Sequence, residues 1–267
     1  MKKGDNMQQL HYGMPTLIET STLEECAKLC AELGLDFIEL NMNLPQYQLD
    51  KIDVKFFKSI ADKYGIYYTI HLDENLNVCD FNSYVADAYI KTVADTIGIA
   101  KQLDIKVLNM HMAKGVYFTL PDRKVLIFSE YKEQYLKSII NFRDMCETAI
   151  GENDIKICIE NCDGYEDFQK EAIELLLESE VFTLTFDVGH NHGIGGTDEE
   201  FIMKYKDRLH HIHLHDAKAR KNHLALGTGE MDIQKYINLS KEQNCRMVLE
   251  TKTIDGLKQS VEWLKGH

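Results

Sequence analysis

Several structural features are scarce or missing in this chain of 267 residues. Proline occurs three times, and no stretch approaches the ~20 consecutive apolar residues that a membrane-spanning helix needs. The first residues, Met-Lys-Lys-Gly-Asp-Asn, contain no apolar leader segment. The seven cysteines include no Cys-x-x-Cys pair, so a disulfide framework is not indicated and a reducing compartment is favoured. We therefore expect a soluble cytoplasmic protein with no membrane partner.

Positive charge is also in short supply. The chain has 30 Lys and Arg against 43 Asp and Glu, which gives a net charge of −13. A field of this sign repels phosphate polyanions, so binding to nucleic acid would need a metal cluster or a local basic rim. Nucleic acid is thus disfavoured as a partner but not ruled out.

The chain shows a regular alternation in place of linkers. With 44% hydrophobic residues it can bury one large core, and no low-complexity segment or composition shift divides it, so we expect a single domain over residues 1–267. Short apolar runs typical of strands alternate with segments of helical periodicity. The expected strands are 8–14, 37–41, 66–72, 105–111, 155–161, 181–188, 209–215 and 245–251, and the expected helices are 22–33, 51–64, 82–103, 129–150, 166–179, 197–207, 232–243 and 256–265.

The boundaries of the first helix have local signals. Ser21, followed three residues later by Glu24, predicts a capping box that begins this helix, and Gly34 predicts its end. Cys26 and Cys30, one turn apart on the apolar face, are expected in the core.

Eight strand and helix units in a chain of this length predict an α/β fold of the (β/α)₈ barrel type, whose usual size is ~250 residues. The alternative is an open, doubly wound sheet, which normally has a glycine-rich turn after its first strand. Here Met14-Pro15-Thr16 occupies that position, with no GxGxxG, so we favour the closed barrel.

Side chains that can bind metal recur at the ends of the expected strands. Because all carboxyl ends of barrel strands meet at one rim, these side chains should surround one site. They are His71, His111, Glu160, Asp187, His190, His213 and Glu250. Two buried acids such as Glu160 and Glu250 repel each other unless a cation lies between them, so a divalent metal is expected. The mixture of imidazoles and carboxylates suits Zn²⁺ or Mn²⁺, and the absence of thiolates argues against a structural zinc site.

Other candidates have two interpretations each. Period-two alternation places His211, His213 and His215 on one face of a strand; we expect His211 to be a core residue and His213 to be a ligand. Glu39 either shapes the site or caps its strand. The basic cluster Lys218, Arg220 and Lys221 either meets an anionic substrate group or is simply solvated.

The full pattern resembles the xylose isomerase-like TIM barrel superfamily, which includes sugar phosphate isomerases and epimerases and the abasic-site nucleases of the endonuclease IV type (AP endonuclease family 2). The resemblance covers nearly the whole chain. Its most specific segments are Phe186-Asp187-Val188-Gly189-His190, His213-Leu214-His215-Asp216, and the segment from His223 to Asp232 that contains Leu226-Gly227-Thr228-Gly229-Glu230.

Resemblance to the epimerase branch implies one metal held by Glu160, Asp187, His213 and Glu250. The two glutamates would then be catalytic. One would remove the proton α to a carbonyl, the metal would stabilise the enediolate, and the other glutamate would return a proton. His190 would contact the substrate.

Resemblance to the nuclease branch implies three zinc ions. His71, His111 and Glu160 would hold the first, and Glu160 would bridge to a second held by Asp187, His213 and Glu250. The third would use His190 and an Asp-x-His loop, of which this chain has His223 but Lys221 in place of the aspartate. The missing carboxylate favours the isomerase and one or two metal ions.

The leading hypothesis is therefore a divalent-metal-dependent isomerase or epimerase of a small sugar or sugar phosphate. The alternative is a zinc-dependent phosphodiesterase or abasic-site endonuclease. A dehydratase or inosose-type isomerase, and a non-catalytic barrel with a structural metal, remain open, as does a homo-oligomeric state. The long segment from Lys114 to Ser129 is expected to contribute to specificity.

Overall fold

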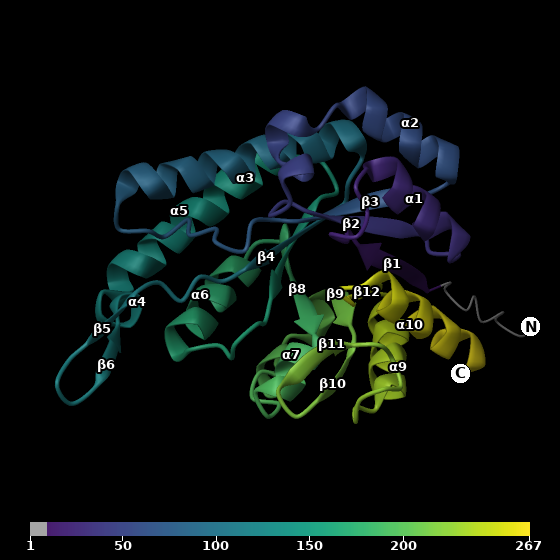
Figure 1. Ribbon diagram of the computed structural model, residues 1–267. Coiled ribbons are helices and arrows are strands. Elements are labelled where there is room, and N and C mark those ends of the chain that lie inside the picture. The colour runs from purple at the N-terminus through teal and green to yellow at the C-terminus, as the bar shows by residue number, and fades with distance from the viewer. Residues whose placement is uncertain (1–9) are drawn as a thin grey trace, which may run out of the picture.

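The computed structural model describes residues 10–267, so the first residues of the chain and positions 8 and 9 of the expected first strand lie outside the described part. Eight parallel strands close into a barrel in the order β1-β12-β9-β8-β7-β4-β3-β2 (Figure 1). This confirms the predicted (β/α)₈ fold. The strands are β1 (His11–Pro15), β2 (Phe37–Asn41), β3 (Tyr67–His71), β4 (Val107–His111), β7 (Lys156–Glu160), β8 (Phe182–Asp187), β9 (Leu209–Leu214) and β12 (Arg246–Leu249).

Helices pack around the outside of the barrel and bury its outward-facing side chains. Long helices occur at most of the predicted places, whereas the segment predicted at 197–207 holds only the short α8 and a 3-10 turn. The helices are α1 (Leu23–Glu32), α2 (Val54–Tyr64), α3 (Ser83–Leu103), α4 (Ile127–Glu130), α5 (Lys132–Ile150), α6 (Asp167–Leu177), α7 (Val188–Gly193), α8 (Glu199–Lys204), α9 (Ile233–Gln243) and α10 (Ile254–Gly266). Within residues 10–267, none of them has the length and apolar character that a bilayer crossing requires.

The first helix begins one residue later than the capping box predicted. Thr22, not Ser21, is the N-cap, and its hydroxyl accepts the backbone N–H of Glu25 at 3.2 Å. The Glu25 carboxylate in turn accepts the N–H of Ser21, so Glu24 is free to pair with Lys63 on α2. The prediction was wrong because Thr22-x-x-Glu25 satisfies the same pattern one residue later; Leu23 and Cys26 on this helix are buried. Gly34 follows the helix with φ +72°, as predicted.

Two hairpins and one short helix are additional to the predicted alternation. Hairpin β5 (Tyr117–Thr119) with β6 (Lys124–Leu126) lies in the long segment after β4 and projects from the barrel at the lower left of Figure 1. Hairpin β10 (Asp216–Lys218) with β11 (Lys221–Leu224) follows β9. Helix α7 starts directly after β8, largely in the interval between the expected strand 181–188 and the expected helix 197–207. Helix α7 and the β10–β11 hairpin pack against each other.

The barrel interior is unusually polar near the rim. In β9 the predicted alternation holds: His211 and His213 are fully buried inside, and Ile212 and Leu214 belong to the apolar core. Buried polar residues on four other strands, Glu39, Thr69, Asn109 and Thr185, join them. Because buried polar groups cost free energy unless they have partners, this layer must be held by specific contacts, and these contacts orient the side chains above it.

Candidate metal centre

Four predicted ligands meet at the carboxyl ends of four strands. Glu160 ends β7, Asp187 ends β8, His213 lies in β9 and Glu250 follows β12. Ligand atoms of all four lie within 4.8 Å of one another. In the barrel β8 and β9 separate β7 from β12, so the two glutamates stand on either side of Asp187 and His213.

Distances within this group suit a shared cation. His213 Nδ1 lies 3.0 Å from Glu160 Oε1, 3.3 Å from Glu250 Oε2 and 3.8 Å from Asp187 Oδ2. Ligand atoms placed tetrahedrally at ~2.0–2.2 Å from an ion are about 3.3–3.6 Å apart. Glu250 Oε2 is buried and has no hydrogen-bond partner among residues 10–267. A divalent ion would satisfy this oxygen, so the residues fit the metal that the sequence predicted.

The same crowding shifts the acid and base equilibria. Burial raises the pKa of Glu160, but the charges of His213 and His111 outweigh it and hold that pKa well below its ordinary value. The pKa of Glu250 is also held well below its ordinary value, because the charges of His213 and Lys252 outweigh the effect of burial. Burial lowers the pKa of His213, yet the carboxylates of Glu160 and Glu39 raise it well above its ordinary value. Glu160 and Glu250 are therefore ionised, and a divalent ion bound beside them would displace the proton from His213, which must be neutral to act as a ligand.

A second group shares Glu160. His71 Nε2 lies 3.3 Å and His111 Nε2 3.1 Å from Glu160 Oε2, whereas Oε1 of the same carboxylate faces His213. His71 Nδ1 contacts the carbonyl of Leu72 at 2.7 Å, and with its single proton on that nitrogen the ring would offer its Nε2 lone pair to a cation beside Glu160. Burial lowers the pKa of His71, but its hydrogen bond to Glu160 and the charge of that residue raise it to about 9. Glu160 is thus placed to bridge two cation positions.

A third group contains two predicted histidines. His190 Nε2 and His223 Nε2 lie 3.2 Å apart. His190 Nδ1 contacts the Cys162 carbonyl at 3.3 Å, and His223 Nδ1 contacts the Glu250 carbonyl at 3.0 Å. The structure therefore brings His190 and His223 together, and both rings point their Nε2 atoms at one position.

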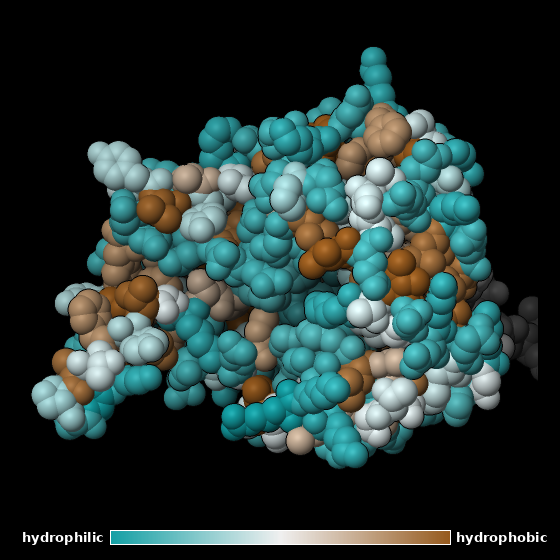
Figure 2. Space-filling model, viewed as in Figure 1, coloured by the Kyte–Doolittle hydropathy of each residue, from teal (hydrophilic) through white to brown (hydrophobic). Residues whose placement is uncertain are grey.

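Open space lies next to these groups. One cavity of about 210 Å³ is lined by His111, Glu160 and Lys114, among others, and a second of about 440 Å³ is lined by His190, Ile194 and Arg220, among others. Both cavities are also lined by Cys162 and Asp163. Figure 2 shows this face with a hollowed centre in which hydrophilic residues predominate.

The basic cluster divides in the structure. Arg220 lines the larger cavity beside His190. Lys218 and Lys221 are opposite each other in the register of the β10–β11 hairpin, and both are exposed. Of the three predicted substrate contacts, Arg220 thus has the most direct access to the cavity beside the metal-binding residues.

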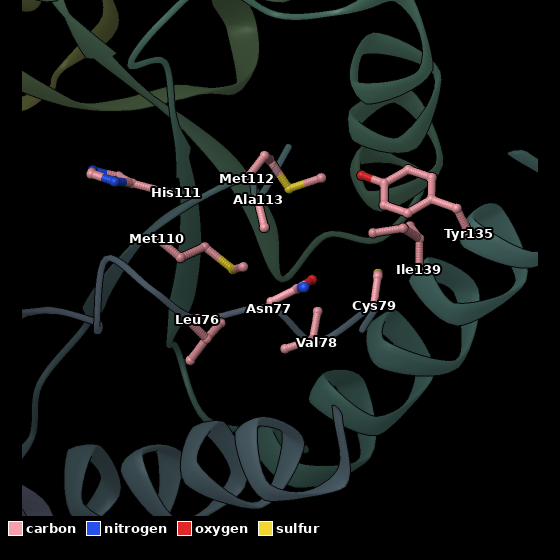
Figure 3. A pocket seen from close by; sticks show the side chains of 10 residues that line it. All are labelled: Leu76, Asn77, Val78, Cys79, Met110, His111, Met112, Ala113, Tyr135 and Ile139. Carbon is pink, nitrogen blue, oxygen red and sulfur yellow. The ribbon is translucent and has the colours of Figure 1, made fainter. Parts of the chain in front are cut away.

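A third hollow is distinct in character. It has a volume of about 10 Å³, the size of one water molecule, and lies between β4 and α5 with His111 at its edge. Figure 3 shows mostly apolar side chains around it, with Asn77 and the hydroxyl of Tyr135 as polar exceptions. It is too small for a substrate.

For four residues near the candidate ligands, the sequence patterns either predicted no role or left the role open. Glu39 accepts a hydrogen bond from Thr69 (3.1 Å) and pairs with His211 Nε2 (3.0 Å). His211 is fully buried, as expected of a core residue, but its Nδ1 has no hydrogen-bond partner among residues 10–267. The Asn109 amide donates to Glu160, and Lys252 Nζ donates to Glu250 Oε1 at 2.7 Å. His215 contacts Asp187. Alternation from His111 could have identified Asn109, and the alternation predicted for the strand at 209–215 already placed His215 on the same face as His213 but gave it no role. No sequence signal indicated Lys252.

Comparisons with known proteins agree with this architecture. An uncharacterized protein of Methanocaldococcus jannaschii is 27% identical over 215 residues, covering 77% of this chain and 79% of the relative. Among solved structures, a D-tagatose 3-epimerase-like protein superimposes with a TM-score of 0.79 at 22% identity over 96% of both chains. The IolI protein with a bound zinc atom gives 0.74 at 14% identity over 96% of this chain and 97% of its own.

The sequence model of one family, described as the xylose isomerase-like TIM barrel, matches residues 27–267. This match includes every candidate ligand and all barrel strands except β1. The chain belongs to the xylose isomerase-like TIM barrel family.

Proposed function

We propose that this protein is a divalent-metal-dependent isomerase or epimerase of a small sugar or sugar phosphate. The observation that carries the proposal is the placement of two buried glutamates, Glu160 and Glu250, on either side of Asp187 and His213. A pair of carboxylates on opposite sides of one position suits removal of a proton from one face of a carbon and delivery to the other. The D-tagatose 3-epimerase-like structure supports ketoses as the first substrates to test.

In this proposal Glu160, Asp187, His213 and Glu250 would hold a Zn²⁺ or Mn²⁺ ion, which would supply positive charge to the oxygens of the substrate as negative charge develops on them. One glutamate takes the proton α to the carbonyl and the other returns a proton to the opposite face. Asn109 donates to Glu160 and Lys252 donates to Glu250, so each carboxylate keeps a fixed orientation. His190 and Arg220 would contact the substrate from the adjoining cavity, and Lys218 and Lys221 would add positive charge near its mouth.

A ketose panel tests the function. We expect the purified chain, loaded with Mn²⁺ or Zn²⁺, to interconvert at least one pair of C3-epimeric ketoses or their phosphates, measured by proton NMR. Glu250→Gln should abolish the conversion. Turnover by the metal-loaded protein that is unaffected by Glu250→Gln and by Glu160→Gln would contradict the proposed mechanism.

A second candidate is a zinc-dependent phosphodiesterase or abasic-site endonuclease. It is favoured by one observation: His71 and His111 flank Glu160, and His190 meets His223, so the chain keeps histidines that a single ion does not require. Cleavage of an abasic duplex together with three tightly bound zinc ions per chain would favour this candidate over the epimerase. The net charge of −13 argues against it, as does Lys221, which is exposed in β11 two residues before His223 and offers no carboxylate to a third ion.

A further inference from the structure

His215 lies one residue beyond β9, and its ring is fully buried beside Asp187. Both ring nitrogens have partners. Nε2 lies 3.1 Å from Asp187 Oδ1 and 3.2 Å from Oδ2, and Nδ1 accepts the backbone N–H of His223 at 2.8 Å. The ring therefore connects a candidate metal ligand to the β10–β11 hairpin.

These contacts determine which nitrogen has the proton. A backbone N–H always carries its hydrogen, so Nδ1 must offer His223 a lone pair and cannot itself be protonated. The other contact of Nδ1, with the Asp216 carbonyl, is longer at 3.4 Å. A neutral imidazole then has its proton on Nε2, which donates to the Asp187 carboxylate. A protonated Nε2 has no lone pair for a metal, so His215 is not a third ligand beside His190 and His223.

The surroundings keep the ring in this place. Gly189 in α7 lies against it, and a Cβ at that position would be 2.0 Å from His215 Cε1. Asp187 is held from the other side, where its Oδ1 accepts the N–H of His190 at 2.6 Å, and its backbone is bonded in both directions to the Asn161 side chain. The orientation of the Asp187 carboxylate is therefore fixed by one backbone donor and by the His215 ring.

We propose that His215 is a positioning residue that orients the Asp187 carboxylate for metal binding and couples this orientation to the β10–β11 hairpin through His223. Hydrogen bonds to a ligating carboxylate commonly change metal affinity 10–100-fold when they are removed. The inference rests on the proposed function, because it takes Asp187 as a ligand of a divalent ion. It adds a role for a residue outside the ligand set.

Two substitutions distinguish the hydrogen bond from His215 to Asp187 from the one that His215 accepts from His223. In His215→Gln the amide nitrogen extends about as far as Nε2 and can still donate to Asp187. In His215→Asn the shorter amide reaches only about the position of Nδ1, so it can accept from His223 but loses Asp187. We expect the Mn²⁺ affinity, measured by competition with a chelator, to be 10–100-fold weaker in His215→Asn and within about threefold of wild type in His215→Gln.

Three other outcomes would contradict the role of His215. Equal Mn²⁺ affinity in wild type and both variants would overturn the inference, as would a loss of metal stoichiometry in both, which would make His215 a ligand. A lower melting temperature of metal-free His215→Asn with unchanged affinity would also overturn it. If His215→Asn does not fold, Gly189→Ala displaces the ring while both nitrogens remain, and it should weaken Mn²⁺ binding.

The same experiment separates the inference from the proposed function. A wild-type chain without affinity for Mn²⁺ or Zn²⁺ would contradict the metal dependence, and the role of His215 with it. The expected pattern of affinities in a protein that converts no ketose would support the role of His215 while contradicting the epimerase.

Discussion

His190 Nε2 and His223 Nε2 face each other at 3.2 Å, and the Nδ1 atom of each ring contacts a backbone carbonyl. When both Nδ1 atoms donate, two lone pairs point at one position, which is the arrangement of two imidazoles that share a metal. Burial lowers the pKa of His223 to about 4, so this ring stays neutral near pH 7.

The first prediction concerns this pair. Lys221 stands where a carboxylate would complete the group, so we expect only weak binding of an additional zinc ion. At excess Zn²⁺, wild type should hold up to one more equivalent than His223→Ala, measured by mass spectrometry under native conditions. His192→Ala, which removes a neighbouring histidine paired with Glu230, is the control and should match wild type. Equal metal content in wild type and His223→Ala would contradict the prediction.

A second prediction concerns removal of the metal. An ion present at about 100 times its dissociation constant stabilises the folded state by about 2.7 kcal/mol. In a chain of this size that corresponds to a melting temperature higher by roughly 5–10 °C. We expect a chelator to lower the melting temperature of wild type by this amount. The melting temperature of Asp187→Asn should change little when the chelator is added. Identical melting curves with and without chelator would argue against a metal centre.

The third prediction compares two glycines of α7. Gly189→Ala places a methyl group against the His215 ring, and overpacking of this kind costs about 1–3 kcal/mol. Gly193→Ala in the same helix meets nothing within 4 Å and serves as the matched control. Urea unfolding should show a lower free energy of unfolding for Gly189→Ala only. Equal stability of the two variants would mean that the ring has room to move.

A fourth prediction concerns pH and His210, a half-buried residue at the opposite end of β9 from the metal-binding group. Burial, followed by the charge of Arg246, lowers its pKa from 6.5 to about 4. Arg246 Nη1 lies 3.2 Å from His210 Nε2. Between pH 4 and 6.5 the unfolded chain therefore binds the proton more readily than the folded protein, and stability falls as the pH decreases through this window. The loss should approach about 3 kcal/mol.

Replacement of His210 isolates this contribution from that of the other histidines. His210→Gln cannot be protonated, so its free energy of unfolding, relative to wild type, should rise as the pH decreases from 6.5 to 4. Parallel stability curves for the two proteins would show that His210 titrates alike in the folded and unfolded states.

The barrel and the convergence of the four candidate ligands could be predicted because both depend on local patterns. The Asp187, His213 and Glu250 positions each follow a short apolar run, and parallel strands bring their ends together whatever the intervening helices are. The register of the first helix was wrong by one residue, since Ser21 and Thr22 offer equivalent capping patterns.

Other features depend on contacts between distant segments. The tautomer of His215 is set by the backbone of His223, eight residues later, and its ring packs against Gly189; neither contact has a sequence signature. The bond from Lys252 to Glu250 requires the path of the chain after β12. The β5–β6 hairpin, with exposed Tyr117 and Phe118, was likewise not indicated by periodicity, since its strands are three residues each.

The central claim is that Glu160 and Glu250 move protons at the carbon next to a carbonyl. Exchange of that carbon-bound hydrogen in D₂O, followed by NMR on a ketose that the metal-loaded protein binds, tests it most directly. We expect solvent deuterium at this carbon in both epimers with wild type, and a rate lower by about 10²–10⁴-fold in each of Glu160→Gln and Glu250→Gln. Epimerisation without deuterium incorporation, or exchange that is unaffected by both substitutions, would contradict the account.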